Sequence, residues 1–218
     1  MIDTYFQLFS KVLSTGNLNL SEKERIKILN LLKEENYEEA GINVDNENLP
    51  LSSIEMYLLD KPELKFLKSK IIEIVNDFMK NTMKYNYNDF KITTSWVAKS
   101  KPGNQSHWHN HNNCFYSGIY YADTHKNCGN LRFSSFQNKR NNLIVSEQNV
   151  LNSDDFYIEP SDNKIVLFPS EMFHAVGKNN SQKDRYSIAF NVVPMGVIGK
   201  GDSQLKTYNY IVEEGKDG

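Results

Sequence analysis

From about residue 92 onward, the sequence alternates between apolar and polar residues in short runs separated by turn residues. The runs most typical of strands are Ile92–Lys99, Tyr116–Ala122, Leu131–Ser135, Ile165–Phe168 and Tyr186–Val193. Side chains of a strand point alternately to its two faces, so a period of two indicates strands with one face in a core. Short strands with irregular loops predict a double-sheet jelly roll or barrel.

The first ninety residues have a helical pattern. Ser21, with Glu24 three residues later, predicts a capping box at the start of one helix. A second helix is predicted from Pro62 to about Met83, and Gly41–Ser53 is predicted to be a loop. We therefore expect a mainly β (α+β) single compact domain. Residues 1–90 would be a helical extension packed on the outer face of a core formed by residues 91–218.

The composition excludes several classes of function. The chain has 218 residues and a formal net charge of -2, without a dense basic run, so nucleic acid is not an expected partner. No apolar stretch is long enough to span a membrane, and Met1–Ser10 lacks the pattern of a signal peptide, so we expect a cytoplasmic protein. The oligomeric state is not predicted.

The two cysteines, Cys114 and Cys128, are too few for a disulfide framework. They flank the Tyr116–Ala122 strand and its predicted hairpin turn, which would bring them near each other. Two free thiols are the expectation for a reducing compartment.

The five histidines are unevenly distributed, because three of them lie within Gln105–His111. Imidazole is the commonest protein ligand of transition metals. The pairs His107/His109 and His109/His111 have the same spacing, so the residues alone leave the ligand pair open. His174 follows a buried strand and is the candidate third ligand. His125 and Asp123 are disfavoured, because a strand of about seven residues, roughly 20 Å long, separates them from the cluster.

Arg185 begins a strand whose two faces differ. Its own face carries Ser187, Ala189 and Asn191, whereas Tyr186, Ile188, Phe190 and Val192 form a face typical of a core. The guanidinium group of an arginine, together with a nearby hydroxyl, can bind a carboxylate. Substrate is expected to enter over the loop Lys99–Gln105 and near Trp96, which makes Trp96 and Gln105 the candidate substrate-binding residues.

An ordered series of pieces between Trp96 and Val193 resembles the iron- and 2-oxoglutarate-dependent oxygenases, in particular a branch of small phage and bacterial proteins related to prolyl 4-hydroxylases. The pieces are Ser95-Trp96, His109-Asn110-His111, Ser117-Gly118-Ile119-Tyr120-Tyr121, Gly129-Asn130-Leu131, Leu167-Phe168-Pro169-Ser170, His174 and Arg185-Tyr186-Ser187. The resemblance implies a double-stranded β-helix that holds one Fe(II).

The resemblance also implies roles for individual residues. His109, His111 and His174 would bind the metal, although position 111 is Asp or Glu in most of the superfamily. Arg185, Ser187 and Tyr121 would hold the distal carboxylate of 2-oxoglutarate. Tyr120 faces the other side of its strand and is not expected to contribute.

The implied activity is that of a dioxygenase, which couples oxidation of 2-oxoglutarate to succinate and CO₂ with hydroxylation of a substrate. No catalytic side chain beyond the metal ligands is required, and the expected partners are 2-oxoglutarate, O₂ and a peptide or small molecule. A prolyl or other peptidyl side chain is favoured by analogy. Two alternatives stay open: a three-histidine, cupin-like metalloenzyme that does not use 2-oxoglutarate, and a non-enzymatic jelly-roll binding or virion protein.

Overall fold

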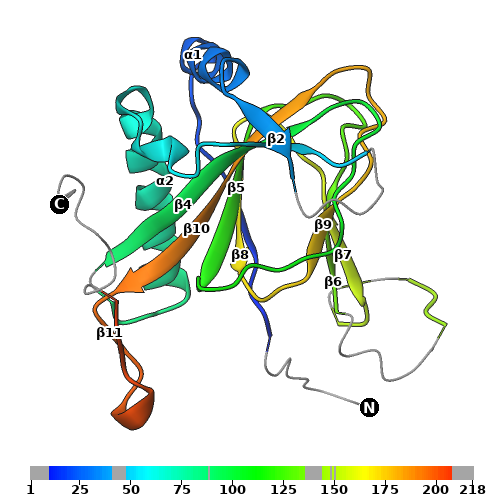
Figure 1. Ribbon diagram of the computed structural model, residues 1–218. Coiled ribbons are helices and arrows are strands. Elements are labelled where there is room, and N and C mark those ends of the chain that lie inside the picture. The colour runs from blue at the N-terminus through cyan, green and yellow to red at the C-terminus, as the bar shows by residue number, and fades with distance from the viewer. Residues whose placement is uncertain are drawn as a thin grey trace.

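Two antiparallel sheets pack against each other in the computed structural model (Figure 1), which describes residues 10–40, 48–87, 89–135, 144–147, 149 and 151–207. The larger sheet has seven strands in the order β1-β8-β5-β10-β4-β3-β2, and the smaller sheet has three in the order β7-β6-β9. Apolar residues of both sheets meet between them, among them Ile119, Val166 and Phe168 of the larger sheet and Leu131 and Phe133 of the smaller one. The predicted jelly-roll architecture is confirmed.

The bounds of the elements are as follows. The larger sheet contains β1 (Ser14–Asn17), β2 (Tyr37–Glu39), β3 (Leu51–Ser53), β4 (Asp89–Ser100), β5 (Tyr116–Asp123), β8 (Lys164–Pro169) and β10 (Arg185–Met195). The smaller sheet contains β6 (Leu131–Ser134), β7 (Asp155–Ile158) and β9 (His174–Val176), and a separate pair is formed by β11 (Val197–Ile198) and β12 (Leu205–Lys206). The helices are α1 (Glu22–Lys33) and α2 (Lys65–Asp77), with a π-helical turn at Phe78–Thr82 and 3-10 turns at Leu58–Asp60, Pro62–Leu64 and Gly201–Ser203.

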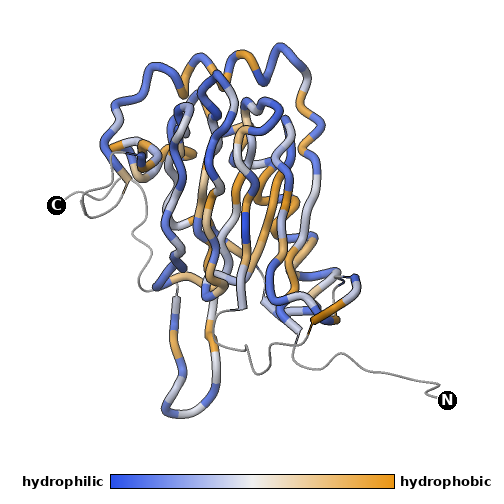
Figure 2. The backbone as a smooth tube through the Cα atoms, turned by 90° about the vertical axis from the view of Figure 1, so that its right-hand side faces the viewer, coloured by the Kyte–Doolittle hydropathy of each residue, from blue (hydrophilic) through white to orange (hydrophobic). Residues whose placement is uncertain are grey.

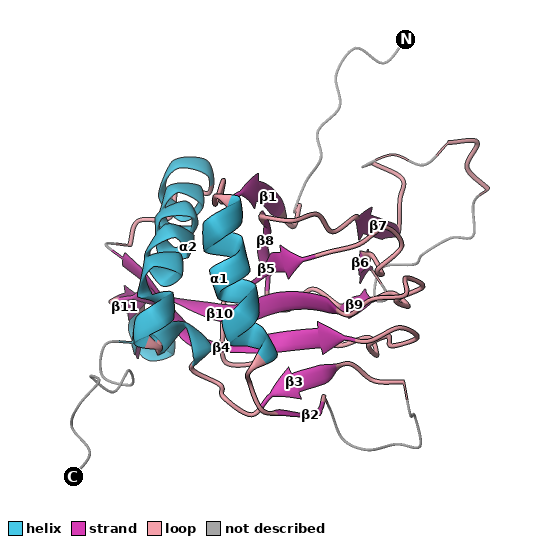
Figure 3. Cartoon of the chain, turned by 90° about the horizontal axis from the view of Figure 1, so that it is seen from above, coloured by secondary structure: helices cyan, strands magenta, loops and turns pink. Residues whose placement is uncertain are grey.

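Both predicted helices are present and lie on the same side of the larger sheet (Figure 3). The capping box at the start of α1 forms as predicted: the Glu24 N–H donates to Ser21 Oγ at 3.3 Å, and the Ser21 N–H donates to the Glu24 carboxylate at 2.8 Å. Leu32 of α1 and Ile71 of α2 belong to one buried cluster with Ile188 of β10. The helices therefore cover the outer face of the larger sheet, and its inner face is turned toward the smaller sheet.

The first ninety residues contribute strands as well as helices, which the sequence analysis missed. β1 pairs with β8, and β3 pairs with both β2 and β4, so all three strands extend the larger sheet. The prediction of a loop over Gly41–Ser53 is wrong at its end, because Leu51–Ser53 is strand β3; residues 41–47 lie outside the described part. The division into two segments at residue 90 stays a prediction.

The two faces of β10 separate as the alternation predicts. Tyr186, Ile188, Phe190 and Val192 lie in the cluster under the helices. The opposite face carries Ser187, which is in register with Tyr121 of β5 and Ala98 of β4. Figure 2 shows that hydrophobic segments gather in the central strands. Ser187, on the inner face of β10, is 2% exposed and so lies within the molecule.

The predicted return of Leu131–Ser135 as the hairpin partner of the preceding strand is wrong. β6 lies in the smaller sheet, where it pairs with β7 and β9 and not with β5. Cys114 is partly buried and Cys128 is buried, and both are free thiols, as expected. Among the described residues, no helix is long and apolar enough to cross a membrane.

Candidate metal and co-substrate site

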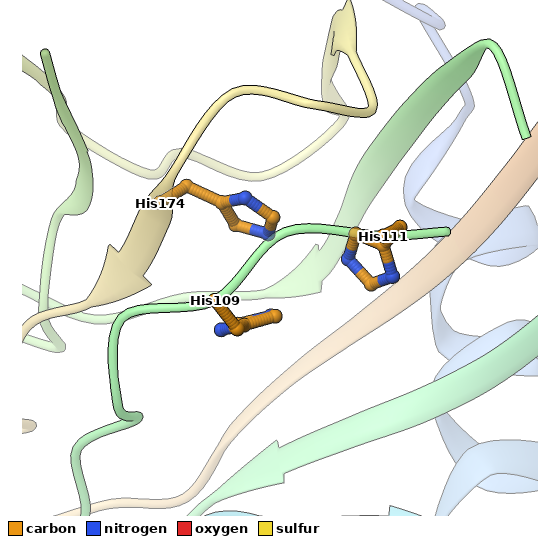
Figure 4. Close-up of side chains that lie close together, drawn as sticks. All are labelled: His109, His111 and His174. Atoms are coloured by element: carbon orange, nitrogen blue, oxygen red, sulfur yellow. The ribbon is translucent and has the colours of Figure 1, made fainter. Parts of the chain in front are cut away.

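Three of the five histidines meet between the two sheets (Figure 4). One potential ligand atom from each of His109, His111 and His174 lies within 4.8 Å of the other two. The ring centroids are 4.3 Å apart for His109 and His174, 5.1 Å for His111 and His174, and 5.3 Å for His109 and His111. These spacings bring the three imidazoles around one point, as a mononuclear metal site requires.

Backbone hydrogen bonds bring the histidines together from distant parts of the chain. His109 forms an antiparallel bridge with His174, the first residue of β9. The N–H of His111 donates to the carbonyl of Ser170, in the loop between β8 and β9, at 3.0 Å. Alternation along the extended segment then directs His109 and His111 to the same side.

The second ring nitrogens of two of these histidines are already engaged. Nδ1 of His109 lies 2.9 Å from the carbonyl of His107, and Nδ1 of His174 lies 2.9 Å from the carbonyl of Met172. A carbonyl oxygen only accepts, so each Nδ1 must carry the proton and donate it. Each Nε2 is then left with a free lone pair, which is the usual arrangement of metal-binding histidines.

The surroundings keep two of the imidazoles, those of His111 and His174, neutral. Burial, with a further contribution from His109, lowers the pKa of His111 to about 4. Burial and the two neighbouring imidazoles likewise lower the pKa of His174 to about 3. Neutral imidazole is the form that binds a metal, so at neutral pH no proton has to leave these two rings first.

The remaining histidines do not belong to the cluster. His107 is exposed and lines the cavity, but it contributes its carbonyl to His109 and no ring to the group. His125 lies beyond β5, with Nε2 at 3.5 Å from the carboxylate of Asp123. Of the two pairs that the spacing allowed, the structure thus gathers His109 with His111.

Arg185 is the most deeply buried cation of the site, with 1% of its surface exposed. Its Nη1 donates to the carbonyls of Cys128 and Gly129, at 3.3 Å each, and its buried Nε has no hydrogen-bond partner among the described residues. No carboxylate among the described residues forms an ion pair with it. A buried cation without a counter-charge is costly, so the site is set up to receive an anion.

Two more predicted residues lie beside this arginine. The guanidinium carbon of Arg185 is 5.9 Å from the centre of the Tyr121 ring, and in the part of the chain that the structure describes nothing hydrogen-bonds to the buried Tyr121 hydroxyl. Burial raises the pKa of Tyr121 to about 12, so its hydroxyl remains a donor. Ser187 is also buried and donates to the carbonyl of Ala98 at 3.2 Å.

One cavity of about 360 Å³ joins the histidine cluster to Arg185. Its remaining walls are mainly apolar and include Leu49, Leu51 and Trp96. The Trp96 ring is 5.7 Å from that of His111, which places it beside the cluster. Gln105 is exposed and is not among the described residues that line the cavity.

A group of polar side chains lies behind His111 and is not predicted from the sequence. Ser117, at the start of β5, lies 2.9 Å from the hydroxyl of Ser170 and 2.8 Å from Oδ1 of Asn191. Only their neighbours across the sheets bring these residues together, so nothing in the local sequence signals them. The alternation along β10 predicts the face on which Asn191 lies, but it predicts none of its contacts.

Comparisons with known proteins agree with this geometry. Residues 94–191, just under half of the chain, match the family model described as "Putative 2OG-Fe(II) oxygenase". The matched region contains all three histidines of the cluster, Arg185, Ser187 and Tyr121. The comparison with curated proteins found no match.

Solved structures share the fold at low sequence identity. A prolyl hydroxylase from Trichoplax adhaerens, in complex with a hypoxia-inducible-factor peptide, has a TM-score of 0.60 at 19% identity and covers 84% of this chain and 83% of its own. A prolyl-4-hydroxylase from Pseudomonas putida has a TM-score of 0.59 at 15% identity, with coverages of 87% and 96%. HygX from Streptomyces hygroscopicus, with nickel and 2-oxoglutarate bound, has a TM-score of 0.60 at 9% identity, with coverages of 84% and 82%.

These likenesses identify the two packed sheets as a double-stranded β-helix. The family's metal is Fe(II), and its co-substrate is 2-oxoglutarate. Residues 94–191 thus match the model of the 2OG-Fe(II) oxygenases, and the chain has the fold of solved structures that include prolyl hydroxylases.

Proposed function

We propose that this protein is an Fe(II)- and 2-oxoglutarate-dependent dioxygenase that hydroxylates its substrate. His109, His111 and His174 would hold Fe(II), since imidazole nitrogens suit this metal and the Nε2 lone pairs of His109 and His174 are free. The bound metal would supply activation of O₂ together with the keto acid. The protein's own contribution would be to position the reactants and to keep the reacting centre away from bulk water.

The observation that carries this proposal is the buried, unpaired state of Arg185. Its Nε and the Tyr121 hydroxyl are both buried donors to which the described residues offer no partner, at a cavity that is also lined by the histidine cluster. A dicarboxylate that reached from the metal to Arg185 would satisfy both donors at one end and chelate the ion at the other. A charge-assisted bidentate contact of this kind is among the strongest that a side chain makes with a carboxylate.

The charge of the site fits the same ligand. Three neutral imidazoles leave an Fe(II) centre with a charge of +2, whereas a site with one carboxylate ligand would retain +1. The 2-oxoglutarate dianion would balance the +2 metal, although Arg185 then remains as one further positive charge. Histidine at position 111 is therefore compatible with the proposed chemistry.

The substrate class is proposed by analogy. The structure from Trichoplax adhaerens is a prolyl hydroxylase with a peptide bound, so a prolyl or other peptidyl side chain is the first candidate. The apolar wall with Trp96 and Leu51 suits an uncharged group next to the metal. A small-molecule substrate is the second candidate, because the structure of HygX was also solved with hygromycin B bound.

The third histidine favours one competing function. Three-imidazole sites also suit metalloenzymes that do not use 2-oxoglutarate, in which case Arg185 would serve another anion. The distinguishing experiment measures succinate release from 2-oxoglutarate by the Fe(II)-loaded protein, with a panel of proline-containing peptides and metabolites. Release that requires Fe(II) supports the dioxygenase, and metal binding without any 2-oxoglutarate turnover supports the competing enzyme.

A further inference from the structure

The polar group behind His111 forms a directed chain of hydrogen bonds. The Ser117 hydroxyl has one hydrogen, which it must donate to Oδ1 of Asn191, because an amide oxygen only accepts. At the 2.9 Å contact between the two serines, the Ser170 hydroxyl is therefore the donor. Nδ2 of Asn191 continues the chain to the hydroxyl of Thr94 at 3.0 Å. The direction thus runs from Ser170 to Ser117, Asn191 and Thr94.

The strands of the larger sheet hold this chain in place. Thr94 of β4, Asn191 of β10 and Ser117 of β5 are direct neighbours in the register of the sheet. Ser117 and Ser170 are 2% and 1% exposed, so water does not compete for their hydroxyl contact. Because three of these side chains lie on paired strands, they form a rigid support for Ser170 at the end of the chain of hydrogen bonds.

Ser170 is the point at which this support meets the histidines. Its carbonyl accepts the N–H of His111 at 3.0 Å, and its own N–H donates to the carbonyl of Phe115 at 3.1 Å. It also begins the short segment that leads to His174, four residues later. The side chain of Ser170 is thus tied to the sheet while its backbone is tied to the segment that carries His111.

We propose that Ser117 and Ser170 are positioning residues for the metal site, and that their buried hydroxyl pair fixes the separation of His111 from His174. The inference rests on the proposed function only in so far as the three histidines bind a metal. Neither serine is one of the proposed metal ligands or of the residues proposed to hold 2-oxoglutarate, although Ser117 lines the same cavity. Their effect is carried by the backbone of Ser170 into the coordination geometry.

The test is the binding of Co(II), as a spectroscopic substitute for Fe(II), by the full chain. Ser117→Ala removes the bridging hydroxyl, and we expect about ten-fold weaker metal binding with a changed visible spectrum of the bound Co(II), a magnitude typical of residues that support metal ligands. Ser170→Ala removes the second hydroxyl of the same contact. This hydroxyl belongs to the loop between β8 and β9, whereas that of Ser117 belongs to strand β5. The double variant should bind Co(II) no more weakly than Ser117→Ala, because the contact between the two hydroxyls is already lost in that single variant.

Ser95→Ala is the matched control. Ser95 is also 2% exposed and lies on β4 of the same sheet, but its hydroxyl accepts the N–H of Leu59 and takes no part in the chain from Ser170 to Thr94. It should lower the melting temperature without changing the Co(II) affinity or spectrum. Wild-type affinity and spectrum in both Ser117→Ala and Ser170→Ala would overturn the inference while leaving the proposed function intact. A wild-type chain that binds no Co(II) would overturn both.

Discussion

His109 and His174 are joined by a reciprocal pair of backbone hydrogen bonds, in which the N–H of each donates to the carbonyl of the other at 2.9 Å. This bridge fixes the Cα positions of two candidate ligands without using their side chains. His111 lacks such a bridge and is held by one backbone bond to Ser170. Replacing a ring of the cluster should therefore change its chemistry without dismantling the segments that carry it.

His111→Asp changes the proposed metal ligand that departs from the His-x-Asp/Glu pattern of the oxygenases that the sequence resembles. The carboxylate adds one negative charge to the site, and its shorter side chain must reach the same position. We expect the variant to retain Fe(II), because a carboxylate is the commoner ligand at this position. We expect succinate release per substrate hydroxylated to change, and both quantities are measured side by side with the wild type.

The control for that experiment is His107→Ala, which removes the exposed histidine whose ring lies outside the cluster. Its metal content should equal that of the wild type. If His111→Asp alters neither metal content nor succinate release, His111 is not a ligand. The assignment of a three-histidine metal site would then be wrong.

Arg185→Ala removes the proposed anchor of 2-oxoglutarate. The loss of a charge-assisted hydrogen bond costs about 1.5–3 kcal/mol, which corresponds to about 10- to 100-fold in the concentration of 2-oxoglutarate required. Metal content should stay near that of the wild type. The comparison variant is Arg25→Ala, which breaks an ion pair with Asp162 near α1 and should leave the 2-oxoglutarate requirement unchanged. Equal requirements in all three proteins would remove Arg185 from the co-substrate site.

The metal-free protein should lose stability in acid through its buried imidazoles. Burial lowers the pKa of His111 to about 4 and that of His174 to about 3, from an ordinary value of 6.5. Between pH 6.5 and these values the unfolded chain binds more protons than the folded one, so the free energy of unfolding falls as the pH falls. Urea denaturation at a series of pH values should show a shallower fall for His111→Asn than for the wild type. Identical slopes would contradict the assigned shifts.

Gly118 is a packing requirement of β5. A Cβ atom at this position would lie 2.2 Å from Cζ of the buried Phe190 and 2.9 Å from a methyl group of Leu167. Gly118→Ala should therefore lower the free energy of unfolding by about 1–3 kcal/mol, as is typical of overpacked cores. Gly177→Ala serves as the comparison, because its nearest neighbour would be at 3.4 Å. Equal urea midpoints for the two variants would refute this explanation of the glycine.

The parts of the fold that could be predicted are those with a clear pattern in the local sequence. Along β10, apolar residues at every second position separate the face of Ile188 from that of Arg185, and the structure has this division. The same alternation distinguished Tyr121, which lines the cavity, from Tyr120, which packs under the helices. The capping box of Ser21 and Glu24 is equally local and forms as predicted.

The parts that the sequence did not predict depend on partners that are distant along the chain. The residues of β1 (Ser14–Asn17) are mostly polar and exposed, and only pairing with β8 makes them a strand. β6 was assigned to its neighbour in sequence, β5, although it pairs across the smaller sheet with β7 and β9. For the same reason, spacing alone did not choose between His107 and His111, since that choice depends on where the loop at Ser170 holds the chain.

The most direct measurement of the central claim is the anaerobic titration of 2-oxoglutarate into four samples: the wild type with and without Fe(II), and Arg185→Ala with and without Fe(II). The proposed site holds the dianion at both ends, so binding should be tightest for the Fe(II)-loaded wild type. It should weaken by about 10- to 100-fold when Arg185 is replaced, and it should also weaken when the metal is withheld. Binding of 2-oxoglutarate that is equally strong in all four samples, or absent from the Fe(II)-loaded wild type, would contradict the assignment of this cavity to Fe(II) and 2-oxoglutarate.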